Sequence, residues 1–242
     1  MQLVKLILWS VVALSSTLVS PNTLAETAKL VGFEAEYTVN RYGRNLGIAK
    51  LSLTPEDENY RLNYYSKVSA FFLSDIRSET SLFSLKKDSS LHPISYAYSR
   101  SGTGRNKSTK IDFDAKDMSI IINQGEPINW QNELDNQLYR LDVQLKLAAG
   151  ETEFSYDIIN SRGQLRHYDL MVVDTEQLAL PFGKLETIKV LFQRENSTRE
   201  TIAWFSPELN YQLVKLQQFK DDKEQGDIRL KSFKSYTTSP NE

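Results

Sequence analysis

The sequence predicts a mainly β protein built on a long curved antiparallel sheet or half-open barrel, with one helix partly covering it. Over most of the chain, apolar and polar side chains alternate with a period of two, which is typical of strands that bury one face. Short clusters of Asn, Asp, Ser, Gly and Pro separate these runs and indicate turns. Only residues 135–148 repeat apolar side chains every three or four positions, which is the period of a helix.

The chain begins with a predicted signal peptide, residues 1–25. Lys5 precedes an apolar run, 6–19, and Thr23 and Ala25 suit the −3 and −1 positions of a signal-peptidase site. Because the run is shorter than the roughly 20 residues that a membrane-spanning helix needs, we expect cleavage after Ala25 rather than retention as an anchor. The mature chain is then expected to be periplasmic and not an integral membrane protein.

The composition limits what residues 26–242 can be. They contain no cysteine, which excludes a disulfide framework, a thiolate nucleophile and an acylated cysteine at a mature N-terminus. Without Lys5, the 29 basic residues fall to 28 against 31 acidic ones, so a mature net charge of −3 gives no support to nucleic-acid binding. No internal repeat or change of composition marks a boundary, so a single β-rich domain is expected.

The first strands are expected in series. Residues 33–39 alternate in polarity, and 46–53 follow after the turn 41–45, so the two runs form a predicted hairpin. A third strand begins at Tyr60, after the turn 54–59. Further strand-like runs cover 76–85, 94–98, 111–113 and 118–122.

Residues 70–74, Ala-Phe-Phe-Leu-Ser, interrupt this alternation with consecutive apolar side chains. Two interpretations compete: a buried turn that plugs the end of the sheet, and an exposed apolar lip of a ligand site. Because isolated aromatic pairs are usually buried, we expect the plug.

The predicted helix has signals at both ends. Asp135 suits the N-cap, and Gly150 suits the C′ position, where the backbone is left-handed. Between them the apolar side chains of Leu138, Leu141 and Leu145 follow the helical spacing. A long sheet that exposes one face needs such a helix as a cover.

Strand-like runs resume after the helix, at 154–158 and 165–173. Residues 180–219 then form a predicted β-meander with a polar turn at 195–198, and a last strand covers 228–230.

Six short segments share their order and spacing with one bacterial family. They are 37–53 with its central Gly47, 91–94 (LHPI), 110–114 (KIDFD), 180–190 (LPFGKLETIKV), 204–208 (WFSPE) and 213–216 (LVKL). On these segments the chain, over about residues 33–233, resembles the domain-of-unknown-function family three-one-zero-eight of exported envelope proteins. The resemblance implies a β-rich fold similar in outline to the half-open barrels of periplasmic lipoprotein carriers. It implies no established reaction and no catalytic residues.

No catalytic, metal or cofactor site is predicted. The histidines are His92, which precedes a proline, and His167 on a strand-like run, and neither has a second histidine at ligand spacing. No G-x-S-x-G elbow is present. Asp112 and Asp114 project to one side of a strand, which is typical of a solvated face, although such a pair could also hold a cation or act as acid and base.

Aromatic side chains on the strands are the remaining unusual feature, with 12 Tyr, 11 Phe and 3 Trp. They are either ordinary core or the lining of a concave, incompletely filled sheet face. The candidate ligand-binding residues on the second interpretation are Tyr60, Tyr64, Tyr96, Tyr98, Phe154, Tyr156 and Trp204.

The sequence is therefore compatible with three functional hypotheses. The first is a non-enzymatic envelope protein that binds a lipid or lipid-linked segment in the concave face. The second is an assembly protein that binds an envelope protein through a sheet edge or the 101–110 loop. The third, an envelope glycan or lipid hydrolase, requires Asp112, Asp114 or His167 to converge in one cleft.

Overall fold

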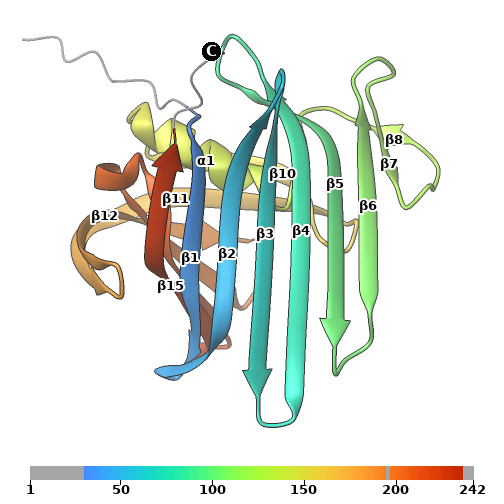
Figure 1. Cartoon of the computed structure of the whole chain (residues 1–242). Helices are drawn as coiled ribbons and strands as arrows, with labels where there is room; N and C mark the ends of the chain where they lie inside the picture. Colours follow the sequence, from blue (N-terminus) through green and yellow to red (C-terminus); the bar gives the residue numbers. More distant parts are fainter. Residues whose placement is uncertain (1–29, 195–196, 237–242) are drawn as a thin grey trace, which may run out of the picture.

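The computed structural model describes residues 30–194 and 197–236 (Figure 1). The predicted signal peptide, residues 1–25, and its cleavage site after Ala25 lie outside these residues. Within the described ranges, no helix has the length and apolar character needed to cross a membrane.

The described chain forms one sheet of 15 strands and a single α-helix, α1 (Leu138–Ala148). The strands are β1 (Gly32–Arg41), β2 (Arg44–Glu56), β3 (Asn59–Ala70), β4 (Leu73–Leu85), β5 (Leu91–Gly102), β6 (Lys107–Asp114), β7 (Ser119–Ile122), β8 (Ile128–Asn129), β9 (Leu134–Asp135), β10 (Glu153–Ile159), β11 (Leu165–Leu180), β12 (Gly183–Gln193), β13 (Arg199–Ser206), β14 (Gln212–Lys220) and β15 (Lys223–Tyr236). A short 3-10 turn, η1 (Pro207–Leu209), separates β13 from β14.

The sheet consists of two meanders that meet at β1 and β15. From β1 the order runs through β2 to β8 at one edge, and from β15 it runs back through β14 to β9 at the other. Within the described residues the edge strands β8 and β9 do not pair, so the sheet is open. All neighbours are antiparallel except β9 and β10. The predicted mainly β fold with a long antiparallel sheet and one helix is confirmed.

Helix α1 lies between the two halves of the sheet and packs against both (Figure 1). Leu138 and Leu141 share a buried cluster with Phe33, Leu62 and Phe83 of the first half. The second buried cluster contains Tyr139, Val143, Leu147, Phe154, Tyr156, Ile158, Leu170, Val190, Phe192, Ala203, Phe205 and Leu213. We call the face of the sheet that packs against α1 the inner face. The helix is therefore an internal element and not only an outer cover.

The ends of α1 agree only partly with the predicted ones. Asp135 belongs to β9, two residues before the N-cap position, yet its Oδ1 still accepts hydrogen bonds from the amides of Gln137 and Leu138. At the other end Gly150 has φ 85° and donates to the Leu147 carbonyl, as predicted for C′. The helix begins two residues later than predicted because Asp135 pairs with β10 before the chain turns into the helix.

The expectation that residues 70–74 form a buried plug is wrong. Phe71 and Phe72 are the two turn residues of the β3–β4 hairpin, and they are 98% and 99% exposed. The ladder continues to the pair Ala70 and Leu73, so the turn projects beyond the sheet, where no element covers it (Figure 1). The competing interpretation, an exposed apolar lip, describes the structure.

Gly47 allows β2 and β3 to approach closely. A Cβ at this position would lie 2.0 Å from the Lys67 carbonyl oxygen. We therefore expect Gly47→Ala to destabilise the protein by about 1–3 kcal/mol, since the strands must move apart. Urea unfolding measures this loss. Gly104→Ala is the matched control, because its nearest neighbouring atom would be 3.9 Å away, and equal losses in both variants would contradict the account.

Candidate functional site

A cavity of about 730 Å³ lies between α1 and the inner face. This volume is within the roughly 300–1,000 Å³ of small-molecule sites. Both halves of the sheet contribute to the lining, which includes Tyr64, Tyr98, Tyr139, Arg140, Tyr168, Phe192, Leu213 and Leu216. The lining also includes Arg41 and Ala70, the last residues of β1 and β3, so the cavity reaches the end of the sheet that carries the β1–β2 and β3–β4 turns.

Arg140 places a cation in this cavity from the first turn of α1. Its Nε is buried and has no hydrogen-bond partner, and within the described residues its guanidinium forms no ion pair. Its Cζ lies 5.0 Å from the centroid of the Tyr139 ring. Burial opposes the charge, but Tyr139 and the Glu79 carboxylate raise the pKa of Arg140, so the guanidinium stays protonated.

The acidic groups that line the cavity have partners of their own. Asp75 pairs with Arg77 at 2.8 Å and with Arg100 at 2.9 Å. Asp227 pairs with Arg229 at 2.8 Å. These carboxylates are therefore neutralised by other arginines.

Glu79 is held by neutral donors. Its Oε2 accepts the hydroxyl of Tyr96 at 2.7 Å and the Nδ2 of Asn136 at 2.8 Å. The carboxylate and the Arg140 guanidinium share the cavity but lie farther apart than a direct ion pair. A buried cation without a direct counter-ion is costly unless a ligand supplies one.

A buried polar network fixes the start of α1, and with it the position of Arg140. The Asp135 carboxylate accepts the hydroxyl of Ser81 at 2.9 Å, in addition to the two helix amides. Asn136, next to it, joins the chain to Glu79 of β4. Apart from the two helix amides, the partners in this network are Ser81 and Glu79, which both lie on β4. The start of the helix is therefore attached to the inner face of the first half of the sheet.

Two of the seven predicted ligand-binding aromatics, Tyr64 and Tyr98, line the cavity. Tyr60 instead stacks on Phe83 with the ring centroids 5.6 Å apart. Tyr96 is buried beneath the cavity, where its hydroxyl holds Glu79.

The other three predicted aromatics lie elsewhere. Phe154 is part of the second buried cluster. Tyr156 lines a separate hollow, described below. Trp204 is buried in the first cluster and does not line the cavity; Lys215 lies 4.0 Å from its ring centroid, and its Nε1 donates to Glu176.

Sequence reasoning missed Arg140 because the helix was treated as a cover with one apolar face. The missed signal is that α1 is apolar on two sides, since Tyr139 and Val143 are as buried as Leu138 and Leu141. A cation between two buried sides of a helix has little room to reach water.

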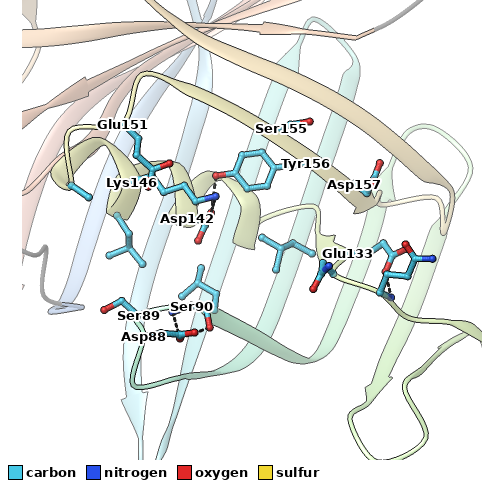
Figure 2. A pocket seen from close by; sticks show the side chains of 16 residues that line it. Asp88, Ser89, Ser90, Glu133, Asp142, Lys146, Glu151, Ser155, Tyr156 and Asp157 are labelled. Carbon is cyan, nitrogen blue, oxygen red and sulfur yellow. Dashed lines mark hydrogen bonds and ion pairs between the residues drawn. The ribbon is translucent and has the colours of Figure 1, made fainter.

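A second hollow, of about 570 Å³, lies between the β4–β5 turn, α1 and β10 (Figure 2). Two of its acidic side chains, Asp88 and Asp142, are engaged by neighbouring lining residues. Asp142 accepts the Tyr156 hydroxyl at 2.7 Å and pairs with Lys146 at 2.9 Å, and Asp88 accepts both the amide and the hydroxyl of Ser90. Across the described residues, no group of three or more His, Asp or Glu could hold a metal ion. This hollow is therefore a weaker candidate for a ligand site than the inner cavity.

His167 has partners that the sequence did not reveal. Its Nδ1 lies 2.8 Å from Asp157, and its Nε2 lies 3.3 Å from both Ser155 and Asp169, all on the exposed β10–β11 pair. The Asp157 hydrogen bond and both carboxylates raise the pKa of His167. Ser155, Asp157, His167 and Asp169 are all exposed, so these contacts lie on a solvated strand surface.

Asp112 and Asp114 do not converge with His167. Both lie on β6, in the first half of the sheet, whereas His167 lies on β11 in the second. Asp114 accepts the amides of Lys116 and Asp117 in the following turn. The convergence that a hydrolase would require is therefore not found among these three residues.

The charge state of His167 provides a direct check of this surface. We expect its NMR-titrated pKa to exceed the ordinary value near 6.5 and to fall in Asp157→Asn. Because the folded pKa is raised, its stabilising contribution is present below about pH 6.5 and is lost as pH rises through the folded pKa. His92 is the internal control, since burial lowers its pKa. A titration of His167 that Asp157→Asn leaves unchanged would refute the assigned contact.

The chain is thus an open antiparallel sheet, built of two meanders, that holds an internal helix and a cavity between them. The family model described as protein of unknown function (DUF3108) matches residues 36–230, and the chain belongs to that family. The resemblance expected from the sequence is confirmed. No curated protein matches the chain.

Two solved structures are similar over most of the chain. One is a Bacteroides fragilis protein with a YmcC-like fold, at 12% identity and TM-score 0.31, covering 84% of this chain and 94% of that one. The other is the Aeromonas veronii immune modulator A, at 10% identity and TM-score 0.24, covering 84% and 78%. At these scores neither likeness bears on function.

Proposed function

We propose that this chain is an exported, non-enzymatic envelope protein that binds an amphipathic ligand in the inner cavity. The observation that supports this most is Arg140, whose buried Nε has no hydrogen-bond partner and whose guanidinium forms no ion pair within the described residues, in a cavity of about 730 Å³. A cavity of this size next to apolar side chains suits an acyl chain, and an unpaired guanidinium suits an acidic head group.

The apolar part of the ligand would lie against the walls of the cavity. Leu62, Leu213 and Leu216 line it from the sheet, and Leu141 lines it from the helix. These side chains offer dispersion contacts but no hydrogen bonds, so they accept an alkyl chain without selecting its length.

The acidic end of the ligand would face Arg140. A guanidinium forms paired hydrogen bonds with a carboxylate or a phosphate, which are stronger than those between neutral groups. Tyr64, Tyr139 and Tyr168 also line the cavity, and the Tyr139 ring, 5.0 Å from the Arg140 Cζ, favours a cation that keeps its charge.

A displacement assay tests the proposal. A dansyl-labelled fatty acid should gain fluorescence on binding the delipidated protein, and an unlabelled fatty acid should displace it better than the alcohol of the same chain length. Leu216→Trp should weaken probe binding by filling the cavity, whereas Leu165→Trp, at an exposed position, should not. Probe binding that Leu216→Trp leaves unchanged would place the ligand elsewhere.

Partner binding through a sheet edge has less support. The edge strands β8 (Ile128–Asn129) and β9 (Leu134–Asp135) are each two residues long. Such short edges leave little free backbone to which a partner strand could be added.

A further inference from the structure

The β3–β4 turn presents an unusual apolar tip, which consists of Phe71, Phe72 and Leu73. The two phenylalanines are almost fully exposed, and Leu73 is 63% exposed. Phe71 also has φ 55°, a backbone conformation that glycine or asparagine normally supplies in two-residue hairpin turns. Neither stability nor turn geometry explains a pair of phenylalanines here, so the apolar side chains themselves need an explanation.

Basic side chains flank this tip on both sides. The β1–β2 turn carries Arg41 and Arg44, and the β5–β6 turn with the start of β6 carries Arg105 and Lys107. All four are exposed, and no carboxylate occurs in residues 41–44 or 101–107. The chain as a whole has a net charge of −2, so these two turns are more basic than the chain as a whole.

The β3–β4 and β5–β6 turns are held together as one surface. The Ser74 amide donates to the Thr103 hydroxyl at 2.8 Å, and the Thr103 amide donates to the Ser74 carbonyl at 3.0 Å. Of the acidic residues close by, Asp75 pairs with two arginines, Glu224 accepts the Tyr42 amide at 2.7 Å and Asp221 pairs with Lys220 at 3.7 Å, while Asp222 is exposed in the β14–β15 turn. The basic side chains and the apolar tip therefore face outward together.

We propose that this end of the sheet docks on an anionic phospholipid surface, with the Phe71–Phe72 tip inserted among the lipids and the flanking basic residues on the head groups. Aromatic side chains that enter the interface beside arginine and lysine are typical of peripheral membrane binding. A protein partner fits less well, because a two-residue tip is small against the roughly 1,000 Å² or more that a specific protein interface buries.

Docking in this orientation would place the cavity at the membrane. Arg41 and Ala70, which line the cavity, belong to the strands that end at the β1–β2 and β3–β4 turns. An amphipathic ligand could then pass between bilayer and cavity without crossing open water. The docking itself depends only on the tip and its basic neighbours, so it stands or falls separately from the proposed ligand.

Vesicle co-sedimentation with residues 26–242 tests the proposal. We expect binding to vesicles of phosphatidylglycerol and phosphatidylcholine, and at least about tenfold weaker binding to phosphatidylcholine alone, since neutral vesicles lack the charge attraction. Phe71→Gly/Phe72→Ser should weaken binding to the anionic vesicles by about tenfold or more. Arg105→Gln/Lys107→Gln should weaken binding to the anionic vesicles only.

Two controls make this test specific. Met118→Ser removes an exposed apolar side chain from the turn between β6 and β7, at the other end of β6, and should bind vesicles like the wild type. Arg140→Gln should also bind like the wild type, so loss of cavity ligand and loss of docking can be told apart. Phe71→Gly relieves the positive φ, so the tip variant should melt no lower than the wild type. The proposal would be overturned if the wild-type protein did not bind anionic vesicles, or if the tip variant bound them as well as the wild type does.

Discussion

Arg140→Gln is expected to weaken the binding of an acidic amphiphile by about 10–100-fold and to leave binding of the matching alcohol nearly unchanged. The reason is that hydrogen bonds to a charged partner contribute about 1.5–3 kcal/mol, which corresponds to that range of affinity. Glutamine keeps most of the side-chain length but removes the charge. Isothermal titration with a fatty acid and with its alcohol measures both effects.

Arg77→Gln is the matched control for this prediction. It removes the same side chain from the same cavity, but Arg77 is already paired with Asp75 at 2.8 Å, so ligand affinity should change little. Arg140→Gln should also leave the melting temperature of the free protein at or near the wild-type value, since it removes an unpaired buried charge. Equal losses of affinity in the two variants, or a loss for acid and alcohol alike, would contradict the role assigned to Arg140.

Asp135→Ala is expected to destabilise the protein by about 2–4 kcal/mol, the largest stability effect we predict. The substitution removes the acceptor for the amides of Gln137 and Leu138 and for the Ser81 hydroxyl, and all of these groups are buried. Asp135→Asn retains one carbonyl acceptor and should cost much less. Urea unfolding of both variants at pH 5 separates them, and similar losses would show that the acceptor does not matter.

The same residue makes stability depend on pH. Burial raises the pKa of Asp135 to about 7, against an ordinary value near 4. Between these values the folded state binds more protons than the unfolded state, so stability falls as pH rises from about 4 to about 7, by up to about 4 kcal/mol. Asp135→Asn should remove most of this slope. If the free energies of unfolding of wild type and variant changed in parallel from pH 4 to pH 8, the raised pKa of Asp135 would be contradicted.

Local patterns were sufficient to predict the longer strands and their hairpins, whereas the two-residue strands β8 and β9 were missed. The alternation in 33–39 and 46–53 corresponds to β1 and β2, and Gly150 marks the end of α1. The pairing of β1 with β15 could not be predicted, because Gly32 and Tyr236 meet only through the assembly of the whole sheet. Contacts so distant in the chain leave no periodic signal in a single sequence.

The candidate site was harder to predict for a related reason. Alternation shows that Tyr64 and Trp204 each lie on one face of a strand, but it does not show which face becomes the inner one. Tyr64 lines the cavity, whereas Trp204 lies in the first buried cluster and does not line the cavity. Phe71 and Phe72 were assigned to the core because aromatic pairs usually are, whereas the register that ends at Ala70 and Leu73 makes them turn residues.

Native mass spectrometry of the protein purified from the periplasm, followed by lipid analysis of an organic extract, tests the central claim most directly. We expect one amphiphile with a carboxylate or phosphate head group bound per chain in the wild type, and little or none in Arg140→Gln. Wild-type protein with only the mass of the free chain, or an equal load of lipid in Arg140→Gln, would contradict a cavity that selects its ligand through the Arg140 guanidinium.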